Sequence, residues 1–348
     1  MSDATASDID ADALARWLSE RQPGPAAPHL ARIGGGQSNP TWFVDWGEAR
    51  FVLRKKPAGP ILPGAHAVER EFRVLDALRD TGVPVPRVRW LEEDPAVLGT
   101  PFYVMDRLEG RVFDDARLPG VTPGERREMY LDMARTLARL HAVRPDAVGL
   151  EDYGKPGNYF ARQIARWTKQ YEASTGPRIA ALDRLVDWLP RHMPEDDGAV
   201  AIAHGDFRIG NLMFHPTEPR VIGVLDWELS TLGHPLADLG FCVIPWHSAP
   251  EEYGGLLGTD WAAAGIPAPE TFVAEYHAHA RPTAELRPFH IAFALFRFAV
   301  IFVGIADRAR AGSAASAEAA TLAPLAERFA IRATEVIDAG AATGEAGP

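Results

Sequence analysis

Three polar side chains follow one another at short intervals near the middle of the sequence: Asp206, Asn211 and Asp226. A loop aspartate at a strand end, an amide one turn later and a second aspartate on a returning strand are what magnesium-dependent phosphoryl transfer from a nucleotide requires. One carboxylate must accept the proton of the attacking hydroxyl, while oxygen ligands hold a hard cation. The pattern predicts Asp206 as the catalytic base, with Asn211 and Asp226 as magnesium ligands.

Residues beside this set have supporting roles in the same prediction. Arg208 would direct a fixed positive charge toward the transferring phosphoryl group, where charge stabilisation is the main catalytic contribution. We interpret His204 as an orienting residue that hydrogen-bonds the loop backbone. Asp238, near the start of a predicted helix, can accept N–H bonds from the catalytic loop or cap that helix.

Two other classes of protein are compatible with some of these residues. A metal-dependent hydrolase would use His204, Asp206, His215, Asp226 and His234 as ligands. Zinc sites favour several histidines in tight register, whereas acids and an amide dominate here, which suits Mg²⁺ better. A nucleotide-binding pseudokinase would keep the fold without turnover, but the sequence gives no reason to favour it because every catalytic position is filled.

The elements before residue 60 are predicted to hold the nucleotide. Strands are expected at Thr41 to Trp46 and at Arg50 to Arg54, joined by a short turn as in a hairpin. The glycine-rich run from Gly34 to Asn39 precedes them and could cover phosphates with its backbone N–H groups, because glycine lets the main chain approach closely. This places Gly35, Gly36, Ser38 and Asn39 in the predicted nucleotide site.

A buried acid is expected in the next element. Apolar residues from Ala65 to Leu78 recur at helical spacing, and Glu71 falls on their inner side. A carboxylate there needs a cationic partner, because burying it unpaired costs too much free energy. Arg54 is the natural partner and Lys55 is its rival, and strand alternation does not decide between them.

Later segments are predicted to be mainly helical. Thr122 to Glu125 has the capping-box spacing of a helix start, with proline at the first helical position. Short strands are expected at Ala199 to Ala203, Leu212 to Phe214 and Val221 to Leu225. The apolar run from Ile291 to Ile305 is too short to cross a bilayer and has Arg297 at its centre, so it predicts a buried helix.

Composition excludes several classes of function. With 47% apolar and 24% charged residues, the 348-residue chain has ordinary globular usage, and its net charge of −11 argues against a nucleic-acid-coating protein. Cys242 is the only cysteine, which fits a reducing compartment and a buried thiol. The acidic N-terminus lacks the features of a signal peptide, so we expect a cytoplasmic protein without a membrane partner.

At these residues the chain resembles the aminoglycoside phosphotransferase and choline-kinase-like superfamily. The resemblance covers nearly the whole chain, because the glycine loop, Arg54, Glu71, the strand at Phe102 to Met105, the catalytic loop, Asp226 and Asp238 come in that family's order. It implies an α+β, protein-kinase-like fold of two lobes, a β-rich N-lobe over residues 1–105 and a mainly helical C-lobe over 106–348. It also implies ATP or GTP as donor, bound near Tyr103 and Met105.

A closer similarity is to the phosphotransferase domain that is fused to acyl-CoA dehydrogenases. The segments Gly35 to Thr41, Leu53 to Pro57, Tyr153 to Tyr159 and Trp227 to Pro235 resemble that branch. The similarity implies a hydroxy acid or hydroxyacyl-CoA as acceptor, with a separate acyl-CoA dehydrogenase acting in the same pathway. An aminoglycoside or a choline-type alcohol is the alternative acceptor.

Two departures and one insert qualify the resemblance. Asn39 replaces the third glycine of a kinase loop, and Arg54 stands where a lysine is expected. The insert over residues 146–198 is typical of small-molecule members and is expected to build the acceptor pocket. Within it Arg162, Arg166 and Lys169 recur at helical spacing, where they could meet a carboxylate or CoA phosphate or simply form a solvated face.

Overall fold

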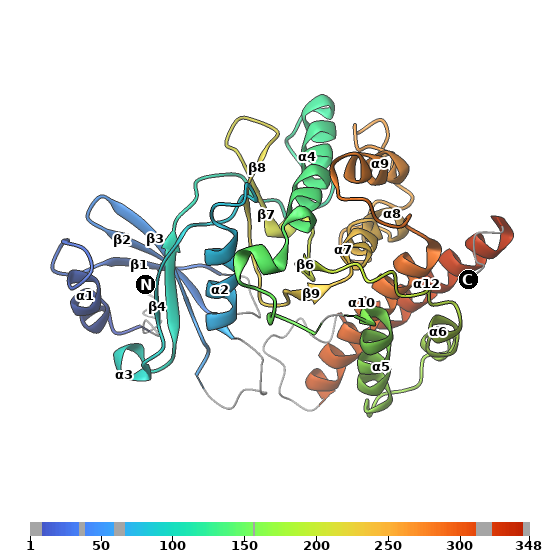
Figure 1. The fold of residues 1–348 in the computed structure, drawn as a ribbon, viewed down its shortest axis with the longest axis horizontal. Helices are drawn as coiled ribbons and strands as arrows, with labels where there is room; N and C mark the ends of the chain where they lie inside the picture. Colours follow the sequence, from blue (N-terminus) through green and yellow to red (C-terminus); the bar gives the residue numbers. More distant parts are fainter. Residues whose placement is uncertain (1–8, 35–38, 59–66, 156, 311–321, 344–348) are drawn as a thin grey trace, which may run out of the picture. The chain divides into compact units, whose positions relative to one another are not determined.

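The computed structural model describes residues 9–34, 39–58, 67–155, 157–310 and 322–343. The chain divides into two compact units (Figure 1): unit 1 comprises Met1–Glu109 with Gly223–Glu228, and unit 2 comprises Gly110–Ile222 with Leu229–Pro348. The sequence predicted a single boundary after residue 105. The structure differs in two ways, because unit 1 extends four residues further and also includes a short segment from much later in the chain.

Local contacts explain both differences. Glu109 forms an ion pair with Arg50 at 3.2 Å, which ties the end of unit 1 to its own sheet. The backbone N–H of Val224 donates to the carbonyl of Pro84 at 2.8 Å, and this bond joins the later segment to unit 1. Asp226 therefore belongs to unit 1, whereas the sequence assigned it to the helical lobe.

Unit 1 is built on one five-stranded antiparallel sheet with the order β1-β2-β3-β5-β4. Its strands are β1 (His29–Arg32), β2 (Thr41–Trp46), β3 (Ala49–Lys55), β4 (Val88–Glu92) and β5 (Phe102–Asp106). The predicted hairpin is confirmed as β2 and β3, and its turn uses Gly47 at a φ of 64°. The strands that the sequence missed, β1 and β4, are the two edges of the sheet.

The described residues of unit 1 also include the helices α1 (Ala11–Ser19), α2 (Val68–Leu78) and the short α3 (Pro95–Leu98). Leu14, Trp17 and Leu18 of α1 are buried in one hydrophobic cluster with strand residues such as Trp42. In α2, Glu71 is buried on the same side as Val68 and Leu75, as the helical spacing predicted. The expected start of this helix, at residue 65, lies outside the described residues.

Unit 2 is mainly helical. Its helices are α4 (Pro123–Ala142), α5 (Tyr159–Glu172), α6 (Ala180–Arg191), α7 (Pro235–Cys242), α8 (Ile244–His247), α9 (Pro269–His279), α10 (Pro288–Arg310) and α12 (Leu325–Thr343). The N–H of Glu125 donates to the hydroxyl of Thr122 at 3.3 Å, which confirms the predicted cap of α4. Short strands pair as β6 (Ala201–Ala203) with β9 (Thr231–Gly233), and β7 (Leu212–Phe214) with β8 (Val221–Val224), whose last two residues are counted in unit 1.

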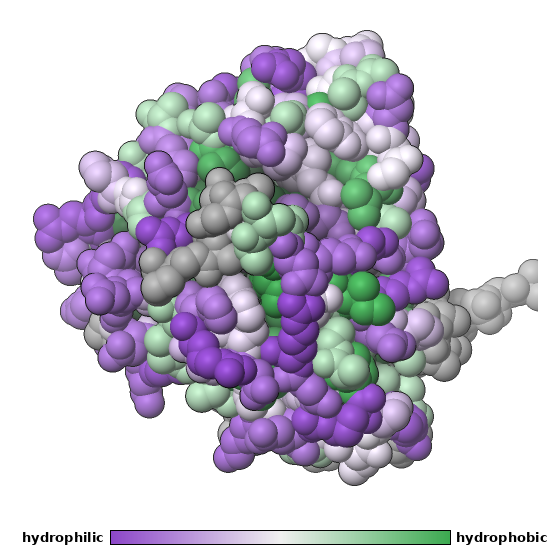
Figure 2. Space-filling model, turned by 90° about the vertical axis from the view of Figure 1, so that its right-hand side faces the viewer, coloured by the Kyte–Doolittle hydropathy of each residue, from purple (hydrophilic) through white to green (hydrophobic). Residues whose placement is uncertain are grey.

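Helix α10 forms the centre of unit 2 and packs against α12, α7, α5 and α6. By length and composition it could cross a membrane, but 78% of its most apolar window is buried inside the fold. The prediction of a buried helix is confirmed, and the helix extends beyond the predicted run at both ends. On the face shown in Figure 2, hydrophilic residues surround smaller hydrophobic patches.

Candidate active site

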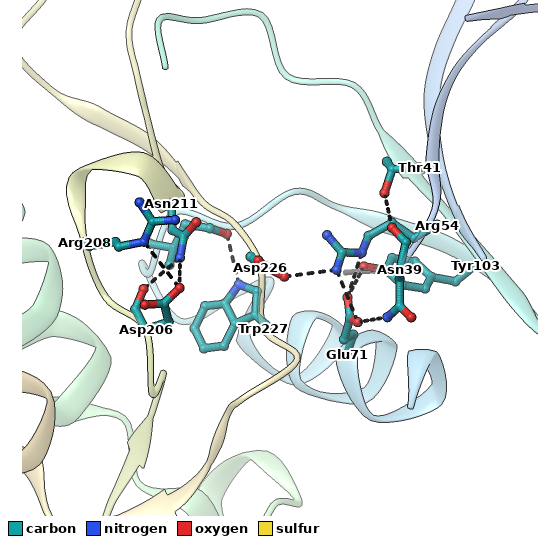
Figure 3. Close-up of polar contacts among 11 residues, drawn as sticks. Asn39, Thr41, Arg54, Glu71, Tyr103, Asp206, Arg208, Asn211, Asp226 and Trp227 are labelled. Carbon is teal, nitrogen blue, oxygen red and sulfur yellow. Dashed lines mark hydrogen bonds and ion pairs between the residues drawn. The ribbon is translucent and has the colours of Figure 1, made fainter. Parts of the chain in front are cut away.

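In unit 1 the buried carboxylate of Glu71 receives three donors (Figure 3). The Nε of Arg54 lies 2.9 Å from its Oε2, the hydroxyl of Tyr103 donates to the same oxygen at 3.0 Å, and the side-chain amide of Asn39 donates to Oε1. The question that the sequence left open is thus answered by Arg54, which forms the ion pair. Glu71 is 1% exposed, so this set of donors compensates a carboxylate that is almost completely removed from water.

Strand register explains why Arg54 faces this carboxylate. Arg54 is directly opposite Tyr103 on β5 and Thr41 on β2, so the three side chains project from the same face of the sheet. Lys55 is the next residue along β3, and alternation directs its buried side chain to the other face. The hydroxyl of Thr41 donates to the carbonyl of Asn39 at 2.8 Å, which fixes the end of the glycine-rich segment beside Glu71.

Arg54 also contacts the second predicted magnesium ligand. Its Nη2 lies 3.0 Å from the Oδ1 of Asp226, so one guanidinium joins two carboxylates of unit 1. Burial alone would lower the pKa of Arg54, but the nearby carboxylates of Glu71 and Asp226 raise it above the ordinary value, and the side chain stays charged. Burial also raises the pKa of Glu71, although the charge of Arg54 opposes this.

The backbone at Asp226 is strained. Its φ is 63°, in the left-handed region that non-glycine residues seldom adopt. The indole N–H of Trp227 donates to the carbonyl of Val224 at 2.9 Å and holds the turn around it. Strain of this kind persists where the surroundings determine the conformation, and it clusters at functional sites.

Only part of the predicted glycine loop belongs to the described residues. Gly35, Gly36 and Ser38 lie outside the described residues, so their contact with a nucleotide remains a prediction. Asn39 is described and buried, and its side-chain oxygen has no hydrogen-bond partner among the described residues. The departure from glycine at this position thus gives Glu71 a donor that glycine could not supply. Met105 is buried on β5.

In unit 2 the structure brings together the three predicted residues of the catalytic loop (Figure 3). The amide nitrogen of Asn211 donates to the Oδ2 of Asp206 at 2.7 Å and to its backbone carbonyl at 2.8 Å. The Nε of Arg208 lies 3.4 Å from the same Oδ2. A neutral amide and a guanidinium therefore both contact the Oδ2 of Asp206 and orient its carboxylate.

Buried polar groups hold the loop that carries Asp206. The carboxylate of Asp238 accepts the backbone N–H groups of His204 at 2.6 Å and Gly205 at 3.0 Å, and the Nδ1 of His204 accepts the N–H of Asp206 at 3.2 Å. Both supporting predictions, for His204 and for Asp238, are confirmed. Burial alone would raise the pKa of Asp238, but its hydrogen bonds with His141 and with the backbone N–H of His204 hold this pKa below its ordinary value.

Gly205 has a conformation that requires glycine. Its φ is 84°, and a Cβ at this position would lie 2.7 Å from the carbonyl oxygen of Leu229. Any other residue would both strain the backbone and displace the neighbouring chain. The step from β6 into the catalytic loop therefore depends on this glycine.

Arg297 is a functional candidate that the sequence analysis did not assign to the site. Its guanidinium donates to the carbonyl of Gly205, one residue before Asp206, and lies over the rings of Trp167 and Phe241 at 5.8 and 5.9 Å. It is buried at the centre of α10, and it forms no ion pair with a carboxylate in the described part of the chain. The available signal was a lone charge in an apolar helix, which must find a polar partner.

We expect Arg297→Met to lower kcat about 100-fold, because a small displacement of a catalytic group costs that much even when the mutation is remote from the reacting atoms. Losing this guanidinium also leaves the buried carbonyl of Gly205 without its donor, so the free energy of unfolding should fall by about 1–3 kcal/mol. Arg297→Lys, which keeps a donor, should recover part of kcat. Steady-state kinetics of Arg297→Met, measured well below its unfolding transition, checks this, and a kcat close to that of the wild type would contradict the role.

Two histidines that a metal-dependent hydrolase would use as ligands form structural hydrogen bonds instead. His234 lies 3.1 Å from Asp197 and caps α7 by accepting the N–H of Leu236, and His215 accepts the N–H of Thr217 at 3.3 Å. Within the described residues no group of three or more His, Cys, Asp or Glu side chains is arranged to hold a metal ion. This argues against a histidine-rich metal cluster.

Two of the concave regions of unit 2 bear on the predicted acceptor site. The larger one, about 680 Å³, includes residues of the predicted acceptor insert together with His234 and His290. The smaller one, about 60 Å³, lies beside Arg208 and has no insert residue in its lining. The basic residues of the insert line neither region: Arg162 donates to the carbonyl of Lys155, while Arg166 and Lys169 are exposed.

His290, in the wall of the larger region, predicts a pH effect on stability. Burial and the nearby His234 lower the pKa of His290 to about 3. In the unfolded chain it should titrate near pH ~6.5, so between these values only the unfolded state binds the proton. Stability should therefore fall as the pH drops through this window, by up to about 1.4 kcal/mol per pH unit from this group. Urea unfolding at several pH values measures this dependence. The unfolding free energy of His290→Gln should change less steeply with pH than that of the wild type, and an unchanged pH dependence would contradict the assignment.

The β-rich unit 1 and the helical unit 2 have the α+β architecture of protein-kinase-like phosphotransferases, and this predicted fold is confirmed. A family model described as the phosphotransferase enzyme family matches residues 29–285, so the chain belongs to that family. The prediction of a small-molecule phosphotransferase is confirmed at this level.

Relatives and solved structures agree with this assignment. Acyl-CoA dehydrogenase family member 10 of Mus musculus is 41% identical over 330 residues, which cover 92% of this chain but only 30% of that relative. A crystal structure from Ralstonia eutropha JMP134, provisionally assigned as an aminoglycoside phosphotransferase, is 45% identical with a TM-score of 0.83, covering 94% of this chain and 99% of that one. Aminoglycoside phosphotransferase APH(4)-Ia shares the fold at 13% identity and a TM-score of 0.62, covering 94% and 99%.

Proposed function

We propose that this protein is a magnesium-dependent phosphotransferase that moves the γ-phosphate of ATP to a hydroxyl group of a small molecule. The observation that carries the proposal is the carboxylate of Asp206, which is oriented by Asn211 and Arg208 on a loop whose backbone is held by Asp238. Such a carboxylate is suited to accept the proton of an attacking hydroxyl. Arg208 supplies positive charge where negative charge develops on the transferring group.

The oxygen donors of the chain fit a magnesium ion. Because the amide nitrogen of Asn211 is used in binding Asp206, its side-chain oxygen is left for a cation, and Asp226 contributes a carboxylate. Mg²⁺ prefers such hard oxygen ligands and usually keeps several of its waters. When bound with the nucleotide, it would neutralise charge on the phosphates. We propose Asn211 and Asp226 as its ligands.

The donor is proposed to be ATP, with GTP as the second candidate. APH(4)-Ia, which shares the fold, was crystallised with AMP-PNP and hygromycin B, and a spectinomycin phosphotransferase with ADP and its antibiotic. In this chain, Gly35, Gly36, Ser38 and Asn39 would cover the phosphates, and Arg54, positioned by Glu71, would contact the α- and β-phosphates. Tyr103 and Met105 complete the proposed nucleotide site, whereas Lys55 projects from the other face of the sheet and is no longer part of it.

For the acceptor we propose a hydroxy acid or a hydroxyacyl-CoA. The support is the 41% identity to a region of a longer protein named as an acyl-CoA dehydrogenase family member. Such an acceptor makes an acyl-CoA dehydrogenase of the same pathway a functional partner, and a cytoplasmic location is part of the same proposal. An aminoglycoside or choline-type alcohol is the competing acceptor, supported by the assignment of the Ralstonia eutropha structure.

A mass-shift screen tests the proposal. The protein is incubated with Mg·ATP and, in parallel, with free hydroxy acids, hydroxyacyl-CoA thioesters, aminoglycosides and choline. We expect a phosphorylated product from the hydroxy acids or their thioesters and none from the other two classes. A phosphorylated aminoglycoside would overturn the acceptor, and no phosphorylated product from any class would overturn the function.

A further inference from the structure

The cavity of about 60 Å³ beside Arg208 has a mainly apolar lining. It is formed by helices α4, α7, α8, α10 and α12 together with the turn around Tyr253, and its larger apolar side chains are Met133, Phe241, Ile244, Phe298 and Phe329. A cavity needs about 10–15 Å³ to hold a water, and one of about 150 Å³ can hold benzene. The size and lining therefore suit a short aliphatic segment.

The charged groups of this cavity do not favour a polycation. The carboxylate of Glu252, which lines it, is already bound by Arg332 through two bonds of 2.9 and 3.0 Å and by the N–H of Ala249 at 2.9 Å. Asp114 is exposed, and Arg208 contributes a positive charge to the wall. An anionic or neutral molecule with an apolar chain fits this charge distribution better than an amino sugar does.

Tyr253 forms one wall and has a strained backbone. Its φ is 68°, and it is followed by Gly254 at 78°, while a Cβ on Gly255 would lie 1.9 Å from the carbonyl of Ser248. A bulky residue at positive φ is a conformational outlier that the surroundings must impose, and such outliers cluster at ligand-binding sites. The turn therefore fixes this tyrosine in place.

The aromatic ring of Tyr253 links the cavity to the catalytic loop. It packs edge-on against Phe298 and Phe302 at centroid distances of 5.4 and 5.6 Å, yet the residue remains 49% exposed. The guanidinium of Arg208 lies 5.7 Å from the ring centroid, within the range of a cation–π contact. Since Arg208 also contacts Asp206, one side chain touches both the predicted base and the wall of the cavity.

We infer that this cavity binds the aliphatic part of the acceptor and that Tyr253 is a specificity-determining residue. The ligand class is a short apolar chain that ends in a carboxylate or thioester, such as the chain of a hydroxy acid. This inference rests on the proposed function and specifies its acceptor. It also places acceptor selection at the turn around Tyr253 rather than in the insert over residues 146–198.

Calorimetric titration with unreactive acyl compounds tests the inference without requiring turnover. The probes are straight-chain carboxylic acids of increasing length and their CoA thioesters, all lacking the hydroxyl. Affinity for the wild type should rise roughly fourfold for each added methylene until the cavity is filled, and then level off. No saturable binding, or an affinity independent of chain length, would overturn the inference.

Two variants assign the effect to the tyrosine. Tyr253→Phe keeps the aromatic ring, so its affinity should still rise with the chain length of the probe. Tyr253→Gly removes this wall of the cavity, so its affinity should no longer depend on chain length. Glycine also relieves the positive φ, so the variant should still fold, which its melting curve checks. An unchanged chain-length series in Tyr253→Gly would overturn the role of Tyr253.

The outcome separates this inference from the proposed function. Chain-length-dependent binding that is lost in Tyr253→Gly supports the cavity even if the matching hydroxy compounds are never phosphorylated, in which case the proposed function fails alone. Phosphorylation whose efficiency ignores chain length would preserve the proposed function and overturn the cavity.

Discussion

Asp206→Asn is expected to lower kcat by about two to four orders of magnitude, the usual contribution of a general base. The asparagine oxygen can still accept the bond from Asn211 that the carboxylate accepts at 2.7 Å, so the loop should keep its conformation. The affinity for nucleotide should change little, because the variant loses proton acceptance and not a donor to the phosphates. Steady-state kinetics with the best acceptor of the screen measures both quantities.

The control for this variant is Asp146→Asn. Asp146 is an exposed carboxylate of the same unit whose partner is the neighbouring Arg144, so its loss should leave kcat and the melting temperature close to those of the wild type. The smallest loss in kcat that is typical for removal of a general base is about 100-fold. If Asp206→Asn retained more than about a tenth of wild-type kcat, the assignment of Asp206 would therefore be wrong.

The second large effect is expected from separating Arg54 and Glu71. Arg54→Met leaves a carboxylate that is 1% exposed without its cation, and Glu71→Leu leaves the buried guanidinium with one fewer carboxylate. Removing one partner of a buried pair typically costs about 3–5 kcal/mol of stability. Urea unfolding should show a loss of this size for each single variant.

The double variant distinguishes an ion pair from two independent contributions. Apolar replacement of a whole buried pair is often close to neutral, so Arg54→Met combined with Glu71→Leu should be much more stable than the sum of the single losses predicts. Catalysis should stay impaired in the double variant, since the positive charge at the nucleotide is absent. Additive losses in unfolding free energy would contradict the proposed pairing.

Much of the fold follows from local sequence patterns. The β2–β3 hairpin could be predicted because a glycine turn joins two runs of β-branched and aromatic residues, and α2 because its apolar residues recur at helical spacing. The inward position of Glu71 came from the same spacing. The strands β1 and β4 gave no such signal, because edge strands are partly exposed and β1 has no alternating burial pattern.

The features of the site that could not be predicted from the sequence depend on contacts between segments that are distant along the chain. Arg297 and Gly205 are 92 residues apart, and no periodic pattern connects a charge in an apolar helix to the loop carbonyl that it binds. The choice of Arg54 over Lys55 required the register of β3 against β5, which places Arg54 opposite Tyr103. The membership of Asp226 in unit 1 depends on a strained turn and one backbone bond to Pro84.

The most direct measurement of the central claim follows the labelled γ-phosphate of ATP into product, with hydroxy acids or hydroxyacyl-CoA as acceptors. Wild type, Asp206→Asn and Asp146→Asn are compared with Mg²⁺ and with Mg²⁺ chelated. We predict label in an acceptor phosphoester for wild type and Asp146→Asn only with Mg²⁺, and a loss of at least about 100-fold in Asp206→Asn. Acceptor labelling at the wild-type rate in Asp206→Asn, or without magnesium, would contradict the account.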